Sequence, residues 1–413
     1  MNKKVDVIVV GGGVCGSFSA MTVAKLGAEV IVYEEHKEIG VPEHCAGHVS
    51  ISGLKRLELS LPKKIVENEI KGAVFYSPSG KEFTVRCASP VTCVVNRQLL
   101  DKHLAGLAEE AGARYILESR AESFLVDSDF VKGVTVRRRG VKETLASSLV
   151  IDAEGCSSVL LKKIGLQTLD RSMVVHAIEA EVDRVKDVEV DMVEVYLGRR
   201  YAPDFFVWII PKRDGSAKVG LAAKTGDPRE YLHQFIHNHP VASKKLRNSK
   251  ITNLSLHPIP LGGAIPKTYG NGFLVVGDAA SQVKPTTGGG IIFGSLCSKI
   301  AGEVAYEALK SDDFSKGFLS RYQSRWRELI GFDLAAMRRI RKLLNSLPDD
   351  KVDKLIGLCS KLEVNKILEE VGDLDFQGKS LVRVVQHPSA LIAALYFVFS
   401  SLISPNSQGN VLR

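Results

Sequence analysis

The feature that most constrains the fold is a glycine-rich turn close to the start of the chain. Residues 5–10 form a short, β-branched apolar run, which favours a strand over a helix. A helical pattern covers residues 17–25, and residues 29–34 predict a second strand that ends in Glu34. The glycines of the turn have the spacing of a Gly-x-Gly-x-x-Gly motif: Gly11, Gly13 and Gly16. This order predicts a complete strand–turn–helix–strand unit.

Such a turn has the chemistry of a dinucleotide site. Gly11 allows the tight turn, Gly13 lets backbone N–H groups approach a pyrophosphate, and Gly16 lets the helix pack close to the sheet. The positive N-terminus of the helix faces the phosphates, and Glu34 is placed to accept hydrogen bonds from a ribose. We therefore expect a bound dinucleotide; the alternative is a purely structural turn.

Length, charge and cysteine content limit the other possibilities. The 413 residues suit two or three domains, and the formal net charge of +8 favours anionic partners such as a phosphorylated cofactor or anionic lipid. The sequence has neither a basic low-complexity tail nor zinc-finger spacing, so nucleic acid is not expected as a partner. Its seven cysteines include no Cys-x-x-Cys pair, so no metal site is expected. Whether Cys87 and Cys93, which flank a predicted bend, form a disulfide stays open.

The beginning of the chain also bears on its location. Residues 1–4 lead directly into the first strand without a signal peptide. The expected compartment is therefore the reducing cytoplasm, with the inner face of the cell membrane as a peripheral location.

Two further segments near the turn carry candidate site residues. The loop over residues 39–48 holds Cys45 between His44 and His48. A cysteine in a small-residue loop beside a cofactor is a candidate tuned thiol, with an inert loop cysteine as the alternative. Arg97 precedes a predicted helix and is a candidate phosphate contact, with an ordinary surface arginine as the alternative.

A second cofactor-like segment occurs late in the chain. An apolar strand over residues 273–276 ends in Gly277 and Asp278, and a glycine-rich loop over residues 284–291 opens a long helix. A helix N-terminus of this kind is a second anion site. An ordinary nicotinamide enzyme has no need of it, whereas the longer FAD needs a distant segment. FAD is therefore the expected dinucleotide.

Strand patterns fill much of the rest of the chain. Those from residue 174 onward are typical of an antiparallel second domain, which we expect to share a sheet with a hairpin over residues 70–92. Residues 203–211 concentrate aromatics and prolines, either as sheet core or as an apolar wall for a ligand. The remaining predicted strands are residues 114–117, 121–124, 131–138, 142–145, 149–152, 174–182, 192–197, 205–210 and 217–223.

The C-terminal part is predicted to be helical from about residue 314. Its last apolar run, residues 391–403, is too short to span a bilayer, and we expect it to pack against the body with some membrane contact. Basic side chains are expected to face solvent or lipid headgroups at Arg321, Arg325, Arg327, Arg338, Arg339, Arg341 and Lys342.

The expected fold class is α/β, with three parts. A Rossmann-like FAD-binding domain is expected over residues 1–69, 93–172 and 255–310. An antiparallel β-sheet substrate domain is expected over residues 70–92 and 173–254, and a C-terminal helical region over residues 311–413.

Together these segments resemble the geranylgeranyl reductase family of the p-hydroxybenzoate-hydroxylase-like flavoproteins, over roughly residues 4–310. The family's marker, Pro-x-x-Tyr-x-Trp-x-Phe-Pro, lines an isoprenoid cavity and stands here as Pro203-x-x-Phe206-x-Trp208-x-Ile210-Pro211. The other motifs are Gly11-x-Gly13-x-x-Gly16 with Glu34, Cys45-Ala46-Gly47, Arg97, the turn from Asp152 to Gly155, Gly277-Asp278 and Gly288-Gly289-Gly290.

The resemblance implies roles for individual residues. It implies that Cys45 lies over the isoalloxazine and takes part in reduction, and that Trp208 packs against prenyl chains beside Pro203, Phe206 and Pro211. The implied cofactor positions are Gly11, Gly13, Cys15, Gly16, Glu34, Cys45, Ala46, Gly47, Arg97, Ala121, Asp278, Gly290 and Ile291.

Three residues depart from the family pattern. Phe206 replaces the marker's Tyr and loses a hydroxyl, and Ile210 replaces its Phe. Glu154 stands where the superfamily turn usually has Asp. These departures affect the predicted identity and polarity of the substrate more than the prediction of a flavin.

The resulting prediction is an FAD-dependent reductase that hydrogenates the C=C bonds of geranylgeranyl chains, carried by an archaeal-type ether phospholipid. Hydride from reduced flavin reaches one alkene carbon and a proton must reach the other; Cys45, with His44 or His48 in a relay, is the candidate acid. One alternative is an FAD-dependent monooxygenase or quinone-linked oxidoreductase, and another is a non-catalytic prenyl-lipid carrier. The electron donor, ferredoxin or NAD(P)H, stays open because a second Gly-x-Gly-x-x-Gly unit is not seen.

Overall fold

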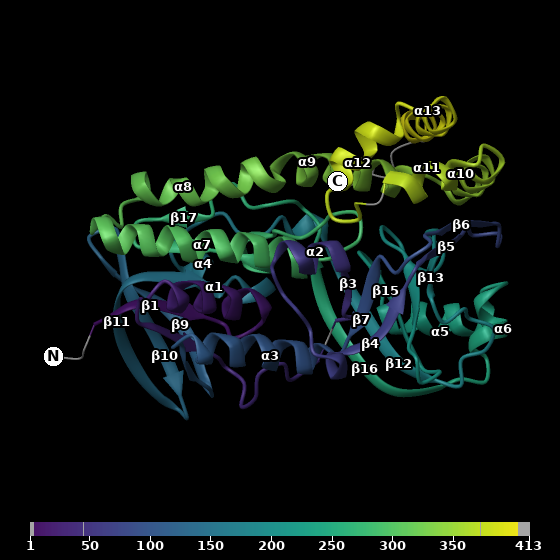
Figure 1. Ribbon diagram of the computed structural model, residues 1–413. Helices are drawn as coiled ribbons and strands as arrows, with labels where there is room; N and C mark the ends of the chain where they lie inside the picture. Colours follow the sequence, from purple (N-terminus) through teal and green to yellow (C-terminus); the bar gives the residue numbers. More distant parts are fainter. Residues whose placement is uncertain (1–3, 44, 372, 404–413) are drawn as a thin grey trace, which may run out of the picture. The chain divides into compact units, whose positions relative to one another are not determined.

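The computed structural model describes residues 4–43, 45–371 and 373–403, and it divides into two compact units (Figure 1). Unit 1 comprises residues 1–43, 96–173 and 260–334. Unit 2 comprises residues 44–95, 174–259 and 335–413. Each unit is assembled from segments that are far apart in the sequence.

Unit 1 is a mixed α/β body. Its strands are β1 Val5–Val10, β2 Val30–Tyr33, β8 Arg114–Ile116, β9 Ser119–Asp127, β10 Phe130–Arg138, β11 Val141–Asp152, β17 Tyr269–Gly270 and β18 Phe273–Val275. Its helices are α1 Val14–Lys25, α3 Arg97–Glu110, α4 Val159–Lys163, α7 Ile291–Ser311 and α8 Lys316–Trp326, with 3-10 turns η2 Gly155–Ser157, η3 Arg171–Met173 and η4 Gly277–Ala280 and a π-helical turn Arg327–Gly331.

The sheet of unit 1 has the strand order β17-β18-β11-β1-β2-β8, with β9 and β10 attached to β11. β1 pairs in parallel with both β2 and β11, and β8 continues the parallel order beyond β2. The β-branched residues of β1 are buried along nearly the whole strand, as in parallel sheets covered on both faces. α1 packs against α3 and α7. The predicted strand–turn–helix–strand unit and the third parallel strand are therefore confirmed.

One predicted boundary in this sheet is wrong. Residues 142–145 and 149–152 were expected to form two separate strands, but both lie in β11. The first half of β11 pairs antiparallel with β10, and its second half pairs in parallel with β1 and β18. The intervening Ala146, Ser147 and Ser148 include no glycine or proline, so nothing in the sequence ends the strand there.

Unit 2 contains a larger sheet and most of the C-terminal helices. Its strands are β3 His48–Ser50, β4 Val66–Ile70, β5 Gly72–Tyr76, β6 Glu82–Arg86, β7 Thr92–Val95, β12 Val174–Asp183, β13 Met192–Tyr196, β14 Val207–Pro211, β15 Ala217–Ala223 and β16 Lys250–Pro260. Its helices are α2 Ile51–Arg56, α5 Pro228–Asn238, α6 Ala242–Leu246, α9 Phe332–Ser346, α10 Asp349–Lys361, α11 Val364–Val371, α12 Gln377–Val384 and α13 Pro388–Ile403, with the 3-10 turn η1 Lys63–Ile65.

The main sheet of unit 2 has the order β16-β12-β15-β14-β13-β5-β6. The hairpin β5–β6 therefore shares a sheet with the later strands, as predicted. The sheet is mixed rather than purely antiparallel, because β13 and β5 pair in parallel. β14 begins two residues later than expected, because Phe205 and Phe206 lie in the turn before it. One face of the sheet packs on α5 and α6 in a core that includes Ile178, Val219 and Phe235.

The two units differ from the three expected domains. Residues 44–69 belong to unit 2, because β7 pairs with both β3 and β4 and ties this segment together. The helices after residue 310 do not form a region of their own: α8 packs against α7 and β17 in unit 1, whereas α10 to α13 build a core in unit 2. All seven cysteines lie within the described residues and none forms a disulfide, Cys87 and Cys93 included.

Candidate functional site

The glycine turn of unit 1 has the shape that its motif predicts. Gly11 has φ +95°, and a Cβ placed on it would lie 2.5 Å from the Ala153 carbonyl oxygen. A Cβ on Gly16 would lie 1.8 Å from the Gly11 carbonyl oxygen. Only glycine fits at these two positions. A Cβ on Gly13 would meet no described atom within 4 Å, so the turn leaves open space at this residue.

That open space lies at the N-terminus of α1. Gly13 is the N-cap residue, and in the described part of the chain no side chain caps the helix there. The N–H of Ser17 donates to the Gly13 carbonyl at 2.9 Å and closes the first turn, which leaves the earlier N–H groups directed out of the helix. The helix dipole adds partial positive charge at the same place. This arrangement suits a pyrophosphate.

Glu34, at the end of β2, is held by its neighbours. Its Oε2 accepts from the Gly12 N–H at 2.7 Å, and its Oε1 accepts from the His36 N–H at 2.9 Å. The His36 ring nitrogen Nδ1 also lies 2.5 Å from Oε1. The Glu34 carboxylate is thus oriented beside the glycine turn. His36 was not predicted from the sequence, where its only signal is its place two residues after the acid.

Ala121 and Arg97 lie on neighbouring elements of unit 1. Ala121 is on β9, two residues after Ser119, whose N–H donates to the Glu34 carbonyl at 2.8 Å. Arg97 begins α3 and forms an ion pair with Asp101 at 3.0 Å from Nη2 to Oδ1. Burial raises the pKa of Asp101, and the Arg97 charge opposes that shift. Asp101 is a second residue that the sequence analysis missed.

Cys15 joins the early and late segments of the site. A Cβ on Gly277 would lie 2.6 Å from the Cys15 Sγ, and one on Gly294 would lie 2.5 Å from it. The thiol therefore packs tightly between η4 and α7, where burial, and next the Asp278 charge, raise its pKa to about 12. Cys15 therefore connects the first turn of α1 with the late segment.

The late segment adds a second helix N-terminus. Gly290 is the N-cap of α7, whose first residue is Ile291, and a Cβ on Gly290 would lie 3.0 Å from Asp278 Oδ1. Asp278 also accepts from the Cys156 thiol at 3.6 Å, and burial raises the pKa of Cys156. Unit 1 thus brings Gly11, Gly13, Cys15, Gly16, Glu34, Arg97, Ala121, Asp278, Gly290 and Ile291 onto connected elements.

The turn after β11 contains Glu154, one of the departures from the family pattern. The Glu154 carboxylate accepts from the N–H groups of Val159 and Leu160, at 2.8 and 2.9 Å. It therefore caps the N-terminus of α4. Asp152, at the end of β11, is fully buried, and burial followed by the neighbouring Glu154 charge raises its pKa well above the ordinary value.

The cysteine loop belongs to unit 2. Cys45 and Ala46 are half-buried, and Gly47 has φ +65° with its Cα against β7, where a Cβ would lie 2.2 Å from the Val95 carbonyl oxygen. His48 Nε2 lies 2.6 Å from Thr92 Oγ1. His44, the other candidate for a proton relay, lies outside the described residues.

The aromatic stretch also belongs to unit 2. Phe205 and Phe206 stack with ring centroids 4.2 Å apart, and Phe206 meets Trp208 edge to face at 6.0 Å. The indole Nε1 of Trp208 donates to Glu179 on β12 at 3.2 Å. The ring lies over Gly220 of β15, where a Cβ would come within 2.4 Å of it. Pro203 lies in the turn before β14, and Pro211 ends the strand.

A buried arginine packs against the rings of this stretch. The Arg341 guanidinium of α9 lies 4.7 Å from the Phe205 ring centroid and 6.0 Å from that of Phe206. The residue is 3% exposed, and burial lowers the pKa of its guanidinium to about 10. The expectation that Arg341 faces solvent or headgroups is therefore wrong, because the rings of the preceding turn cover it.

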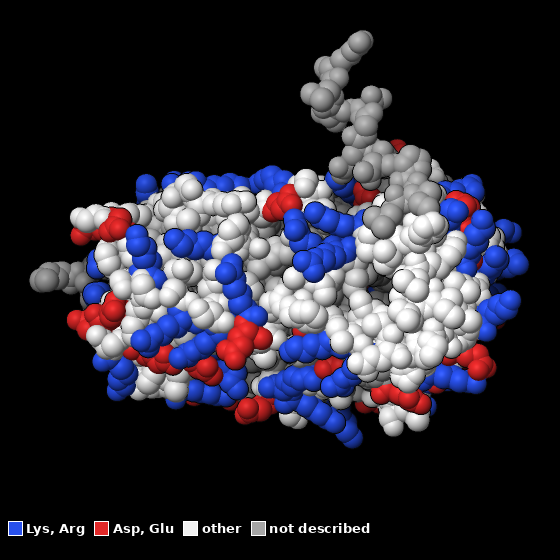
Figure 2. All heavy atoms as spheres, turned by 90° about the horizontal axis from the view of Figure 1, so that it is seen from above, with Lys and Arg blue, Asp and Glu red and all other residues white. Residues whose placement is uncertain are grey.

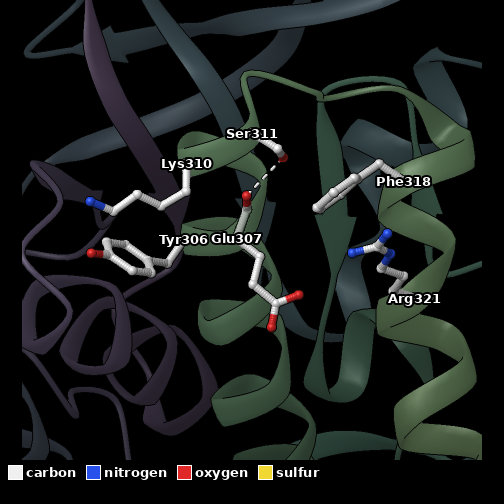
Figure 3. A pocket seen from close by; sticks show the side chains of 6 residues that line it. All are labelled: Tyr306, Glu307, Lys310, Ser311, Phe318 and Arg321. Atoms are coloured by element: carbon white, nitrogen blue, oxygen red, sulfur yellow. Dashed lines mark hydrogen bonds between the residues drawn. The ribbon is translucent and has the colours of Figure 1, made fainter.

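The pocket shown in Figure 3 is separate from these residues. It is an open depression of about 400 Å³ between α7 and α8. Glu307 on its wall is paired with Arg325 through two bonds of 2.8 Å. Its lining residues are Tyr306, Glu307, Lys310, Ser311, Phe318 and Arg321, which include no predicted site residue.

Known proteins with similar sequences show the family to which this chain belongs. Residues 4–294 match the family model described as the FAD binding domain. The chain is 37% identical over 381 residues to digeranylgeranylglycerophospholipid reductase 2 of Methanothermobacter thermautotrophicus, which covers 89% of this chain and 97% of that protein. This chain belongs to the digeranylgeranylglycerophospholipid reductase family. Its cofactor is FAD.

Other members support the same assignment. The digeranylgeranylglycerophospholipid reductase of Methanocaldococcus jannaschii is 36% identical over 86% of this chain and 90% of its own length. A geranylgeranyl bacteriochlorophyll reductase-like protein of Thermoplasma acidophilum, of known structure, has a TM-score of 0.84 and 27% identity over 96% of this chain and 99% of that chain. The open Gly13 position, the N-terminus of α1 and the oriented Glu34 suit a dinucleotide such as FAD.

Proposed function

We propose that this chain is an FAD-dependent reductase of the C=C bonds in the geranylgeranyl chains of digeranylgeranylglycerophospholipid. The observation that carries the proposal is the 37% identity, over nearly the whole of both chains, to a relative with that name. The aromatic wall of unit 2 supports it, because long isoprenoid chains need an extended apolar surface. The formal net charge of +8 suits an anionic lipid.

Unit 1 holds the cofactor in this proposal. The N-terminus of α1 and the open position at Gly13 receive the pyrophosphate, and Glu34 accepts hydrogen bonds from the adenosine ribose. Asp278, with the N-terminus of α7 at Gly290 and Ile291, serves the other end of the molecule. When bound and reduced, FAD supplies the hydride.

Cys45 supplies the proton. Hydrogenation of an isolated alkene adds a hydride to one carbon and a proton to the other, so the protein must contribute an acid. A free, half-buried thiol in a loop ordered by Gly47 suits this role. His48, whose Nε2 lies against Thr92, is available to return a proton to the thiol between turnovers.

The aromatic stretch binds the prenyl chain. Because the Trp208 Nε1 already has a partner in Glu179, the indole presents apolar ring to a ligand at no hydrogen-bonding cost. Pro203, Phe206 and Pro211 extend the same wall. Burial of hydrocarbon there stabilises the complex by about 25 cal/mol per Å². Phe206, where the family marker has Tyr, makes the wall more apolar.

Two partners complete the proposal. An electron donor must reduce FAD again after each turnover, and ferredoxin and NAD(P)H are the candidates. Because the substrate resides in a bilayer, the protein makes peripheral contact with the inner face of the membrane.

The test is anaerobic reoxidation. The purified holoprotein is reduced with dithionite, and its visible spectrum is followed after addition of digeranylgeranylglycerophospholipid in detergent. We expect the oxidised flavin spectrum to return with this lipid and not with its saturated analogue. No reoxidation by the lipid, but reoxidation once oxygen and an aromatic substrate are admitted, would favour the monooxygenase. A colourless protein that binds the lipid, even after FAD is added, would favour the carrier.

A further inference from the structure

Most of the large apolar side chains of the helix α13 are exposed. Its inner face in unit 2 carries the small residues Ala390 and Ala393 and the half-buried Phe397, which pack into the cluster formed with α10 and α11. Its exposed face carries large ones: Leu391, Ile392, Leu395, Val398 and Phe399. Leu395 is 60% exposed and Phe399 is 67% exposed. A surface helix that packs only on its own protein has the opposite pattern.

The preceding helix extends this surface. Leu381 and Val382 of α12 are also exposed, and α12 and α13 meet at a bend of 115°. In Figure 2 a broad uncharged area fills much of the right-hand half, where α10 and α13 lie in Figure 1, and Lys and Arg side chains border it. We call the exposed apolar residues of α12 and α13 the α12–α13 surface.

The dimensions of the two helices exclude a simple membrane span. Among the described helices none is by itself long and apolar enough to cross a membrane, and only the bent pair α12 and α13 passes the test of length and composition. The 16 residues of α13 give a length of about 24 Å, against about 30 Å of bilayer hydrocarbon. Such a helix can lie within the interface of a leaflet.

The charges beside this surface favour an anionic leaflet over a second copy of the chain as its partner. Between residues 377 and 403 the charged side chains are Lys379 and Arg383, with no Asp or Glu. Both are exposed and lie one turn apart on α12, beside the apolar residues. A two-fold pairing of this surface with a second copy would bring the cations of both copies to one interface without an acid. A lipid leaflet complements the surface in two ways: its anionic headgroups match the two cations, and its hydrocarbon matches the exposed apolar side chains.

We propose that the α12–α13 surface inserts into the headgroup region of an anionic leaflet, with the large side chains of α13 in the hydrocarbon and Lys379 and Arg383 on lipid phosphates. The exposed side chains of α13 are all apolar. A protein interface normally includes polar contacts, whereas lipid hydrocarbon needs none. The inference rests on the proposed function and deepens it by naming the surface that meets the substrate's bilayer.

The test measures binding separately from turnover. The holoprotein is sedimented with vesicles of equal parts phosphatidylglycerol and phosphatidylcholine, and with vesicles of phosphatidylcholine alone. We expect the double variant Leu395→Gln/Phe399→Gln to lower the partition constant on the mixed vesicles by about tenfold or more. The matched control is Ile251→Gln/Leu254→Gln, which changes two exposed apolar residues of β16 and should bind like wild type. Lys379→Gln/Arg383→Gln should bind both kinds of vesicle equally.

A second variant measures how deeply α13 inserts into the bilayer. Phe399→Trp should be quenched by phospholipids brominated in the acyl chains, whereas Ile251→Trp should not. Wild-type protein that fails to sediment with the mixed vesicles would overturn the inference, as would equal binding by Leu395→Gln/Phe399→Gln. A wild-type protein that is a dimer in solution and becomes a monomer in that variant would also overturn it. Vesicle binding without turnover of detergent-dispersed lipid would contradict only the proposed function, and turnover in detergent without vesicle binding would contradict only the surface.

Discussion

At the scale of single residues, the site depends on two glycines that have no side chain, Gly13 and Gly16, and on the thiol of Cys45. Gly13 and Gly16 both belong to the motif, but their surroundings differ. A Cβ on Gly16 would lie 1.8 Å from the Gly11 carbonyl oxygen, whereas one on Gly13 would meet no described atom within 4 Å. The motif alone does not distinguish a residue needed for folding from one needed for the ligand; the structure does.

Gly13→Ala should therefore impair FAD binding and leave folding intact. Its methyl group meets no described protein atom, so the apoprotein should change in free energy of unfolding by at most about 1 kcal/mol, while the Kd for FAD rises about tenfold or more. Gly16→Ala should lower both FAD affinity and apoprotein stability. Gly106→Ala, in open space on α3, is the control: it should leave FAD affinity unchanged and stabilise the apoprotein by at most about 1 kcal/mol. Equal loss of stability at positions 13 and 16 would contradict this assignment.

Cys45→Ala should retain FAD and lose alkene reduction. General acid catalysis is worth about 10²–10⁴ in rate, and the variant has no proton to give. Flavin content is measured from the visible spectrum and turnover from the rate of anaerobic reoxidation by lipid. Cys87→Ala, which removes a free cysteine of another loop, should behave like wild type. A Cys45→Ala protein that turns over at the wild-type rate would exclude the thiol as the acid.

At the scale of elements, strand ends and strand pairs position the chemistry. Asp152 ends β11 in a buried position beside Glu154, and Trp208 of β14 lies against Gly220 of β15. Neither contact follows from local pattern, because each depends on which strand lies next to which.

Asp152→Asn should stabilise the protein at neutral pH. The raised pKa means that, above the ordinary pKa of about 4, the folded state keeps a proton that the unfolded state loses, so the free energy of unfolding falls as pH rises. Asparagine removes this dependence. We expect a Tm gain of at least about 2 °C at pH 7 that disappears near about pH 3. Exposed Asp127→Asn is the control. Lower stability at pH 7 would mean that the ionised carboxylate is needed.

Gly220→Ala should disturb the substrate wall and spare the cofactor. The added methyl group would lie 2.4 Å from the Trp208 ring and displace it, at a cost typical of overpacking, about 1–3 kcal/mol. We expect about a tenfold higher KM for the prenyl lipid with unchanged flavin content. A normal KM would show that the indole does not contact the chain.

At the scale of the whole molecule, most of the correct predictions are local, although the sheet shared by β5–β6 with the later strands was also predicted. The β1–α1–β2 unit, the β5–β6 hairpin and the late α7 segment follow from consecutive residues, so their patterns were sufficient. The Arg341 stack on Phe205, the packing of Cys15 against Gly277 and the assignment of residues 44–69 to unit 2 join positions far apart in the chain. A single sequence has no signal for such contacts, and a basic residue like Arg341 is by default expected at the surface.

The most direct test of the account is the mass of the lipid product. Holoprotein reduced with dithionite is incubated without oxygen with digeranylgeranylglycerophospholipid, and the extracted lipid is analysed by mass spectrometry. The account predicts mass gains in steps of one hydrogen pair for each double bond reduced, absent when Cys45→Ala replaces wild type. A fully reduced flavoprotein that leaves the lipid mass unchanged would contradict the proposed reductase.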